Sequence, residues 1–133
     1  MLFDLRLLKP EDALPTFALA RLYDPALIPG DWTAQLQRPA STEGTFAAFG
    51  GPTARALARY IITRTTDGVE VLVIRWVTAF DLIDPERVAL ELIAAVRARA
   101  EQDHRLVAWS PCAREASGFE RAVAGQAVLH SVL

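Results

Sequence analysis

One stretch decides the architecture of this chain: VEVLVIRWVTAFDLIDPERVALELIAAVRARA, residues 69–100. Its first part, Val69 to Val77, is a near-continuous apolar run, which predicts a strand buried on both faces. A short connection, Thr78 to Ile83, leads to Asp84-Pro85-Glu86, which combines an N-cap carboxylate, an N1 proline and a first-turn acid. The following helix has an apolar stripe at Val88, Ala89, Leu92, Ile93, Val96 and Ala100. In α/β proteins, ligands usually bind at the carboxyl end of such a strand.

The composition predicts one domain, residues 1–133, that is large enough for a core. Hydrophobic residues make up 52%, but no apolar run approaches the roughly 18 residues of a membrane span, so we expect no membrane insertion. A net charge of −2 gives no electrostatic reason to expect nucleic acid as a partner. The single cysteine excludes an internal disulfide, and the N-terminus has no secretory signal, so we expect a cytoplasmic protein.

The residues before the central stretch predict strands and helices in alternation. We expect a strand from Leu2 to Leu8, helices from Pro15 to Tyr23 and from Asp31 to Gln37, and strands from Thr45 to Phe49 and from Arg55 to Thr65. Asp31 is the expected N-cap of the second helix. Asp67-Gly68 predicts a hairpin turn, which makes the Val69 to Val77 strand antiparallel to its predecessor.

The residues after the main helix predict a strand, a helix and a last strand: Leu106 to Trp109, Ser110 to Gly125 and Ala127 to Val132. The complete order is β-α-α-β-β-β-α-β-α-β. An antiparallel meander that runs into a βαβ unit predicts an α/β fold, with a mixed sheet of six strands and helices on both faces.

This order resembles that of the GNAT acyltransferase fold, over nearly the whole chain. Residues 83–93, IDPERVALELI, look like the family's strand-loop-helix segment at its acetyl-CoA site, and residues 118–125, GFERAVAG, look like its late aromatic helix. The resemblance implies a divergent N-acyltransferase or acyl-CoA-binding protein that transfers an acetyl group from acetyl-CoA to an unknown amine. Because the sequence ends at Leu133, we expect the family's last strand to be missing here.

The resemblance also assigns residues to the cofactor. It places the pantetheine against the strand-end backbone of Val77, Thr78 and Ala79, and the diphosphate against Arg87, Val88 and Ala89. In the family, the loop before this helix reads [Q/R]-x-x-G-x-[G/A], and its backbone N–H groups hold the CoA diphosphate.

The matching residues 84–89, DPERVA, conform to that pattern only at Ala89. Arg87 stands at the central glycine position, Pro85 lacks an N–H, and Asp84 and Glu86 bring negative charge to a diphosphate site. These departures leave a second interpretation open: a non-catalytic GNAT-fold module for self-association or partner binding.

Two residues are candidates for the proton transfers of acyl transfer. The resemblance expects a tyrosine near Phe119, which has no proton to give, so Tyr60 and Tyr23 remain, and Tyr60, on a meander strand, is the candidate. Glu70 and Asp81 are the carboxylates nearest the central strand, and Asp81 is the candidate because it lies at the strand's carboxyl end. The alternatives are a packing tyrosine and a turn carboxylate that binds its own backbone.

Other polar residues carry weaker signals. Arg75 interrupts the apolar strand, so it lies on an open sheet face, pairs with a carboxylate or reads an anion in the cleft. Cys112 could pair with His104 or His130 as a nucleophile, or be buried and inert. Two histidines and one cysteine, widely spaced, give no metal-site signature.

The apolar composition and the last strand predict a homodimer. The strand from Ala127 to Val132 would expose an apolar edge without proline or lysine, and such an edge pairs readily with another chain. The alternative is that residues 3–8 or the loop of residues 38–45 cover this edge within one chain.

Overall fold

The computed structural model describes residues 3–110 and 118–126. Its described strands form one sheet in the order β1-β2-β3-β4-β5. Their bounds are Asp4–Leu7 (β1), Glu43–Gly50 (β2), Thr53–Arg64 (β3), Glu70–Ala79 (β4) and Leu106–Trp109 (β5). The first three pairings are antiparallel and β4 pairs with β5 in parallel, as expected for a mixed sheet.

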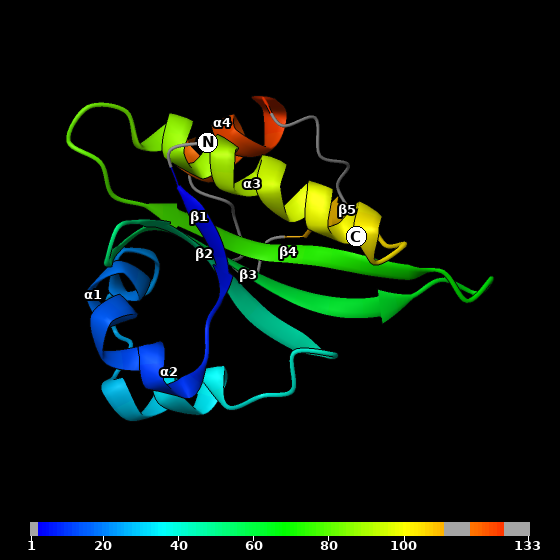
Figure 1. Ribbon diagram of the computed structural model, residues 1–133, viewed down its shortest axis with the longest axis horizontal. Coiled ribbons are helices and arrows are strands. Elements are labelled where there is room, and N and C mark those ends of the chain that lie inside the picture. Colours follow the sequence, from blue (N-terminus) through cyan, green and yellow to red (C-terminus); the bar gives the residue numbers. More distant parts are fainter. Residues whose placement is uncertain (1–2, 111–117, 127–133) are drawn as a thin grey trace.

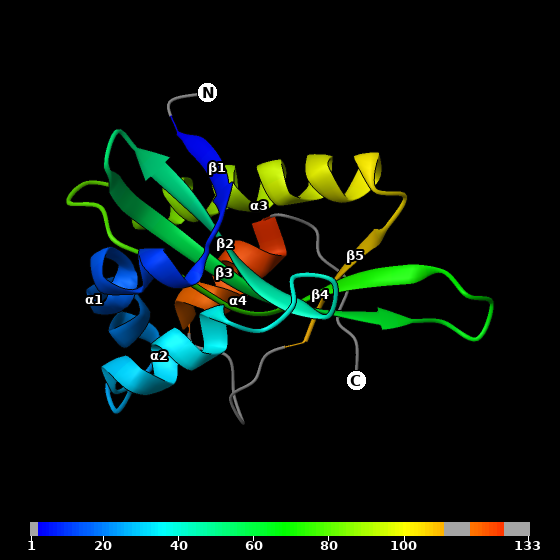
Figure 2. The same cartoon turned by 60° about the horizontal axis from the view of Figure 1, so that its bottom comes forward.

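Helices cover both faces of the sheet (Figure 1). A 3-10 turn, η1 (Pro10–Asp12), leads into α1 (Ala13–Tyr23), and α1 and α2 (Pro29–Leu36) lie against one face. The long helix α3 (Pro85–Gln102) and α4 (Gly118–Gln126) lie on the other face, and Figure 2 shows the same separation from another side. The element order thus confirms the α/β prediction as far as α4. The expected last strand and Cys112 lie outside the described residues.

Two apolar clusters fill the two sides of the sheet. On the α3 side, Ile74 of β4 packs with Leu92 and Val96 of α3, all fully buried. On the α1 and α2 side, Trp32 packs against Leu57 and Trp76. The Trp32 indole Nε1–H donates to Thr16 Oγ1 at 3.0 Å, which satisfies its polar atom inside the core.

The central strand β4 is buried on both faces, as its sequence predicts. It also contains a bulge: Arg59 pairs with Trp76 and Tyr60 pairs with Ile74, so Arg75 has no opposite residue in β3. Leu72 and Ile74 face α3 before the bulge and Val77 faces α3 after it. The bulge therefore lets apolar residues of both halves reach the same core.

Local signals fix the main turns. Gly68 adopts φ +84° in the predicted hairpin turn, and the Gly68 N–H donates to the Thr65 carbonyl at 3.0 Å. The Asp84 carboxylate caps α3 by accepting from the Arg87 N–H at 3.1 Å, and Pro85 is the first helical residue. Both predictions are confirmed.

Several predicted boundaries differ from the observed ones by two or three residues, and two of these differences are informative. The second helix begins at Pro29 rather than after Asp31, because the proline ring presets helical φ at N1 and Ile28 is the extended N-cap. The central strand continues to Ala79, which pairs with Ala56, and the Phe80 N–H donates to the Arg55 carbonyl at 2.9 Å. The loop before α3 therefore begins at Phe80.

Candidate active site

Strand β5 pairs with only the first part of β4. They pair only from Val71 to Ile74 of β4, opposite Leu106 to Trp109, and the last bond runs from the Ser110 N–H to the Ile74 carbonyl at 3.0 Å. Beyond this point β5 ends, whereas β4 continues to Ala79. Among the described residues, no strand pairs with residues 75–79 on this side of β4, and we call this edge of β4 the wedge.

Helix α4 brings a carboxylate to this wall. The Val77 N–H donates to Glu120 Oε2 at 3.2 Å, and Glu120 is only 3% exposed. A buried carboxylate is stable only when it is paired or hydrogen-bonded. The Glu120 carboxylate therefore connects α4 to the part of β4 that the family resemblance assigns to the pantetheine.

The residues predicted to meet pantetheine lie in the last part of β4. Val77 and Thr78 are buried and Ala79 is partly buried. Their backbone groups, rather than their side chains, would be available to a ligand in the wedge. The Val77 N–H is at present taken by Glu120, a contact that the sequence did not predict.

The residues predicted to meet the diphosphate lie in the first turns of α3. Val88 and Ala89 point into the core, so only their backbone could serve a ligand, whereas Arg87 is exposed. Arg87 Nε lies 3.6 Å from Glu91 Oε1, and the Arg87 N–H donates to the Asp84 carboxylate. Pro85 has no N–H to offer a ligand, and the Arg87 N–H is already bonded to the N-cap carboxylate of Asp84.

Asp81 organises the loop that joins these two segments. Its Oδ2 accepts from the Ile83 N–H at 3.1 Å and from the Asp84 N–H at 2.7 Å. The Asp84 N–H and then the Ile83 N–H stabilise the ionised form and lower the pKa of Asp81. These are the contacts of a turn carboxylate, the alternative that the sequence left open.

Tyr60 lies on β3 opposite Ile74, before the wedge opens. Its hydroxyl donates to the Ala40 carbonyl at 2.8 Å, and its ring meets Phe46 edge-on at 5.1 Å. Burial raises the pKa of Tyr60, with nearby arginines, Arg105 first, opposing the rise. The hydroxyl is thus protonated at neutral pH and engaged with the backbone, as a packing tyrosine is.

Sequence reasoning missed Glu120. Its signal was present, because an acidic residue stands between Phe119 and Val123 on the face of a short amphipathic helix. The resemblance had also placed a polar side chain near Phe119. Only the packing of α4 against β4 shows that this side chain is Glu120 and that it points inward.

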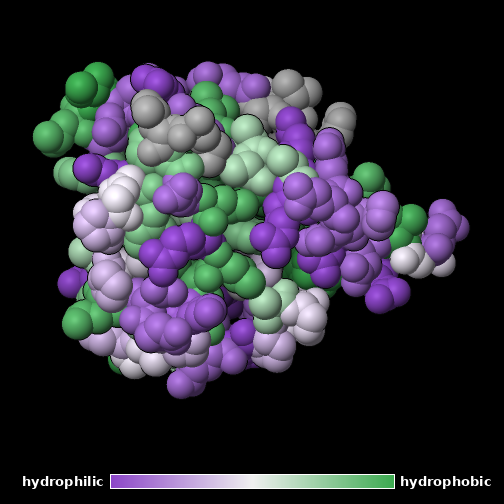
Figure 3. Space-filling model, viewed as in Figure 1, coloured by the Kyte–Doolittle hydropathy of each residue, from purple (hydrophilic) through white to green (hydrophobic). Residues whose placement is uncertain are grey.

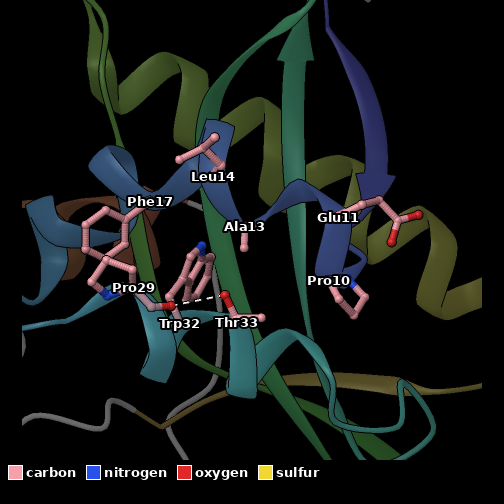
Figure 4. Close-up of a pocket in the computed structure, with 8 residues that line it drawn as sticks. All are labelled: Pro10, Glu11, Ala13, Leu14, Phe17, Pro29, Trp32 and Thr33. Atoms are coloured by element: carbon pink, nitrogen blue, oxygen red, sulfur yellow. Dashed lines mark hydrogen bonds between the residues drawn. The ribbon is translucent and has the colours of Figure 1, made fainter.

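Two pockets are lined by described residues on the α1 and α2 side. One, of about 260 Å³, lies between α1 and α2 and is mainly apolar, and its residues are Pro10, Glu11, Ala13, Leu14, Phe17, Pro29, Trp32 and Thr33 (Figure 4). The other, of about 290 Å³, is lined by more charged side chains than the first. Its residues are Tyr23, Gln35, Arg38, Glu43, Arg59, Ile61, Arg75 and Trp76. We refer to the second as the arginine pocket.

The loop before α3 exposes apolar side chains. Leu82 and Ile83 are 90% and 93% exposed, and Phe80 is half exposed. In Figure 3 this loop forms part of the green surface at the upper left. No group of three or more potential metal ligands occurs in residues 3–110 and 118–126. None of the helices in those ranges has the length and apolarity to cross a membrane.

Comparison with known proteins places this arrangement in a fold class. No family model matches the sequence, and no curated protein sequence matches it. Solved structures do match. A ribosomal-protein-alanine N-acetyltransferase from Brucella melitensis has a TM-score of 0.78 at 16% identity, over 97% of this chain and 93% of that one.

Two aminoglycoside acetyltransferases are similar in the same way. One, from an uncultured soil metagenomic sample and in complex with sisomicin, has a TM-score of 0.74 at 8% identity, over 99% of this chain and 92% of that one. The other, in complex with CoA, has a TM-score of 0.73 at 16% identity, over 98% and 90%. At such identities the likeness is one of fold, and the protein has a GNAT-like fold.

Proposed function

We propose that this protein is an acyl-CoA-dependent N-acyltransferase. The observation that carries the proposal is the wedge, the edge of β4 from the Arg75 bulge to Ala79 on which no described strand pairs, and from which the loop to α3 continues. An extended pantetheine arm suits this edge of β4, because it can hydrogen-bond with strand backbone on which no described strand pairs. One structural neighbour is itself in complex with CoA.

The proposed roles follow the positions of the residues. The backbone of Val77, Thr78 and Ala79 would meet the pantetheine, and Arg87 with the Val88 and Ala89 backbone would meet the diphosphate. In the reaction, the acceptor nitrogen forms a bond to the acyl carbon, the carbon–sulfur bond breaks, and the proton lost by nitrogen ends on the thiol. Acetyl-CoA is the proposed donor and a small-molecule or protein amine the proposed acceptor, with Asp81 and Tyr60 as the predicted proton-transfer residues.

A second candidate is a non-catalytic GNAT-fold module, and two contacts favour it. The Asp84 carboxylate takes the Arg87 N–H, which a diphosphate would need, and Glu86 adds negative charge beside it. The Glu120 carboxylate takes the Val77 N–H inside the wedge. Binding of CoA would have to displace or accommodate both carboxylates.

Thermal unfolding with and without acetyl-CoA separates the two candidates. A ligand that binds only the native state adds about 2.7 kcal/mol at ~100 times its dissociation constant, so the first candidate predicts a clear rise in melting temperature. Desulfo-CoA and free adenosine diphosphate serve as controls for the thioester and for the nucleotide end. No shift at millimolar acetyl-CoA would remove the acyl-CoA proposal and favour the non-catalytic module.

We also propose a homodimer, on the apolar composition and on the edge expected at the last strand. Light scattering would test it. A mass near 14.6 kDa at tens of micromolar contradicts the dimer, and a mass near twice that value supports it. If the protein truncated after Gly125 is still a dimer, the interface does not depend on the expected last strand.

A further inference from the structure

Strand β1 is an edge of the sheet (Figure 1), because among the described strands only β2 pairs with it. The Leu8 N–H donates to the Thr45 carbonyl at 2.9 Å, and this bond sets the phase of the ladder. In an antiparallel pair, hydrogen-bonded and non-hydrogen-bonded residues alternate, so the even-numbered residues of β1 direct their backbone groups to β2. The N–H and C=O groups of Leu5 and Leu7 therefore point to the open side of the strand.

The side chains of this edge differ between its two faces. The apolar ones, which pack partly buried against the core on the α3 side, are Phe3, Leu5 and Leu7. The charged side chains of Asp4 and Arg6 are exposed on the other face, where Arg6 Cζ lies 4.2 Å from the centre of the Phe49 ring. One face of the edge is thus apolar, and the other carries two opposite charges two positions apart.

This pattern is self-complementary. When two copies of β1 pair antiparallel about a two-fold axis at Leu5, that residue stands opposite its own copy and exchanges both backbone hydrogen bonds with it, because its N–H and C=O groups point outward. Phe3 then stands opposite Leu7 of the other copy, so the apolar face continues across the axis. Asp4 stands opposite Arg6 of the other copy, in the non-hydrogen-bonded positions where side chains are closest.

Charge selects this register over its neighbours. An axis at Asp4 would place the two Asp4 carboxylates opposite each other, and an axis at Arg6 would do the same with the two guanidinium groups. Like charges directly opposite destabilise a strand pair. A slip of the register by one residue would instead put apolar side chains beside charged ones. The axis at Leu5 is therefore the symmetric arrangement that pairs opposite charges and apolar side chains together.

A short edge strand with charges can also be a means of preventing strand pairing. That explanation suits charges of one sign, which repel a second copy in every register, whereas Asp4 and Arg6 have opposite signs. No ion pair of Asp4 occurs among the described residues. Arg6 Nη2 lies 3.3 Å from Asp12 Oδ1, but the Arg6 side chain is 49% exposed, so its other N–H groups can bind a second carboxylate.

We propose that β1 is a self-association surface, on which two copies of this chain pair antiparallel about Leu5 and join their five-stranded sheets into one. The inference rests on the homodimer of the proposed function and does not depend on acyl transfer. It places the interface at the edge of the described sheet opposite β5. Because β1 has only four residues, we expect a modest affinity, with the dimer populated from tens of micromolar.

Sedimentation equilibrium at low ionic strength, from low to hundreds of micromolar, measures the association. Asp4→Arg makes both charged positions positive, and Arg6→Glu makes both negative. Each variant should associate roughly tenfold more weakly than the wild type, because two pairs of opposite charge become pairs of like charge. An equimolar mixture of the two variants should regain the dimer, since every charge pair across the axis is again of opposite sign.

Glu101→Arg is the matched control, because it makes the same change of charge at an exposed position of α3. It should associate as the wild type does, and its mixture with Arg6→Glu should not regain the dimer. Circular dichroism verifies that each variant is folded. If Arg6→Glu does not fold, the comparison of Asp4→Arg with Glu101→Arg still decides the question.

A wild type that is monomeric at hundreds of micromolar overturns the proposal, and so do β1 variants that associate as the control does. A dimer that is lost on truncation after Gly125 but is unchanged in the β1 variants would assign the interface to the expected last strand instead. Recovery in the mixture of the two β1 variants alone supports the pairing about Leu5. Thermal unfolding with acetyl-CoA tests the acyl transfer separately, whichever result the association gives.

Discussion

The Glu120 carboxylate accepts a hydrogen bond from the Val77 N–H at 3.2 Å, although 43 residues separate the two in the sequence. The contact joins α4 to the edge of β4 on which no described strand pairs, and it places a carboxyl group in the wedge. It stabilises the fold, and it also competes with any ligand that needs the same N–H.

We expect Glu120→Ala to lower the free energy of unfolding by about 1–3 kcal/mol, because the Val77 N–H would be buried without an acceptor. Glu120→Gln keeps a side-chain oxygen and should cost less. Urea denaturation of the three proteins measures both differences. Equal losses for the two variants would show that the carboxyl oxygen is not what matters at this position.

The start of α3 gives a prediction on CoA affinity. Arg87→Gln should weaken acetyl-CoA binding, and Glu86→Gln should strengthen it by removing a negative charge from the first turn. Arg99→Gln is the matched control at the other end of the helix. Arg99 Nε lies 3.6 Å from Asp103, as Arg87 Nε does from Glu91, and both side chains are more than half exposed. If Arg87→Gln and Arg99→Gln have equal effects on the binding isotherm, the diphosphate does not dock at this helix end.

The pair of Arg59 and Glu43 predicts strong coupling. Arg59→Met should destabilise the protein by about 3 kcal/mol, because it removes one partner of a largely buried ion pair and leaves Thr45 without its donor. Glu43→Gln should cost less, since Gln keeps an acceptor oxygen near Arg59. The double variant should be more stable than the sum of the single losses predicts, as chemical denaturation would show. Strict additivity would indicate that the two side chains do not interact.

Asp81 predicts a difference in stability at acid pH. Two backbone N–H groups lower the pKa of Asp81 below that of a free aspartate, so its contribution to stability is present above the unfolded-state pKa and is lost as pH falls through the folded-state pKa. The gap in melting temperature between the wild type and Asp81→Ala should stay constant near neutrality and close below about pH 4. Asp4→Ala, at an exposed position of β1, is the control. A gap that persists unchanged into strong acid would contradict the lowered pKa.

Tyr60→Phe tests the predicted catalytic role against packing. The Ala40 carbonyl loses its donor, so we expect a loss of about 1 kcal/mol in stability. If the hydroxyl also transfers a proton, kcat should fall by roughly 10²–10⁴ with little change in KM. A kcat equal to that of the wild type would leave packing as the role of Tyr60.

Local sequence signals predicted the central unit of the fold well. The Asp84 cap, the Pro85 start and the apolar stripe of α3 all depend on residues a few positions apart, and the structure confirms them. The Asp67-Gly68 turn has the same local character. Tertiary contacts decided the boundaries that were wrong: Ala79 belongs to β4 because Ala56 of β3 lies opposite it.

The sequence predicted less of the candidate site than of the fold. The bulge at Arg75 was hidden because β4 is apolar on both faces, so its sequence has no alternation from which a change of face could be read. The arginine pocket assembles Arg38, Arg59 and Arg75 from three elements, and no spacing along the chain predicts that they meet. The inward direction of Glu120 likewise depends on how α4 sits against β4.

The bulge also means that β4 has two phases. Up to residue 74 its even-numbered side chains face α3, and from residue 77 its odd-numbered side chains do so. Loss of residue 75 would remove the bulge and place Trp76 directly after Ile74, with Trp76 still toward α1 and Val77 still toward α3, whereas loss of any other residue of the strand would turn part of it over. The tolerance of this strand to the deletion of a single residue should therefore be highest at Arg75, because every other deletion exchanges core and opposite-face side chains along part of β4.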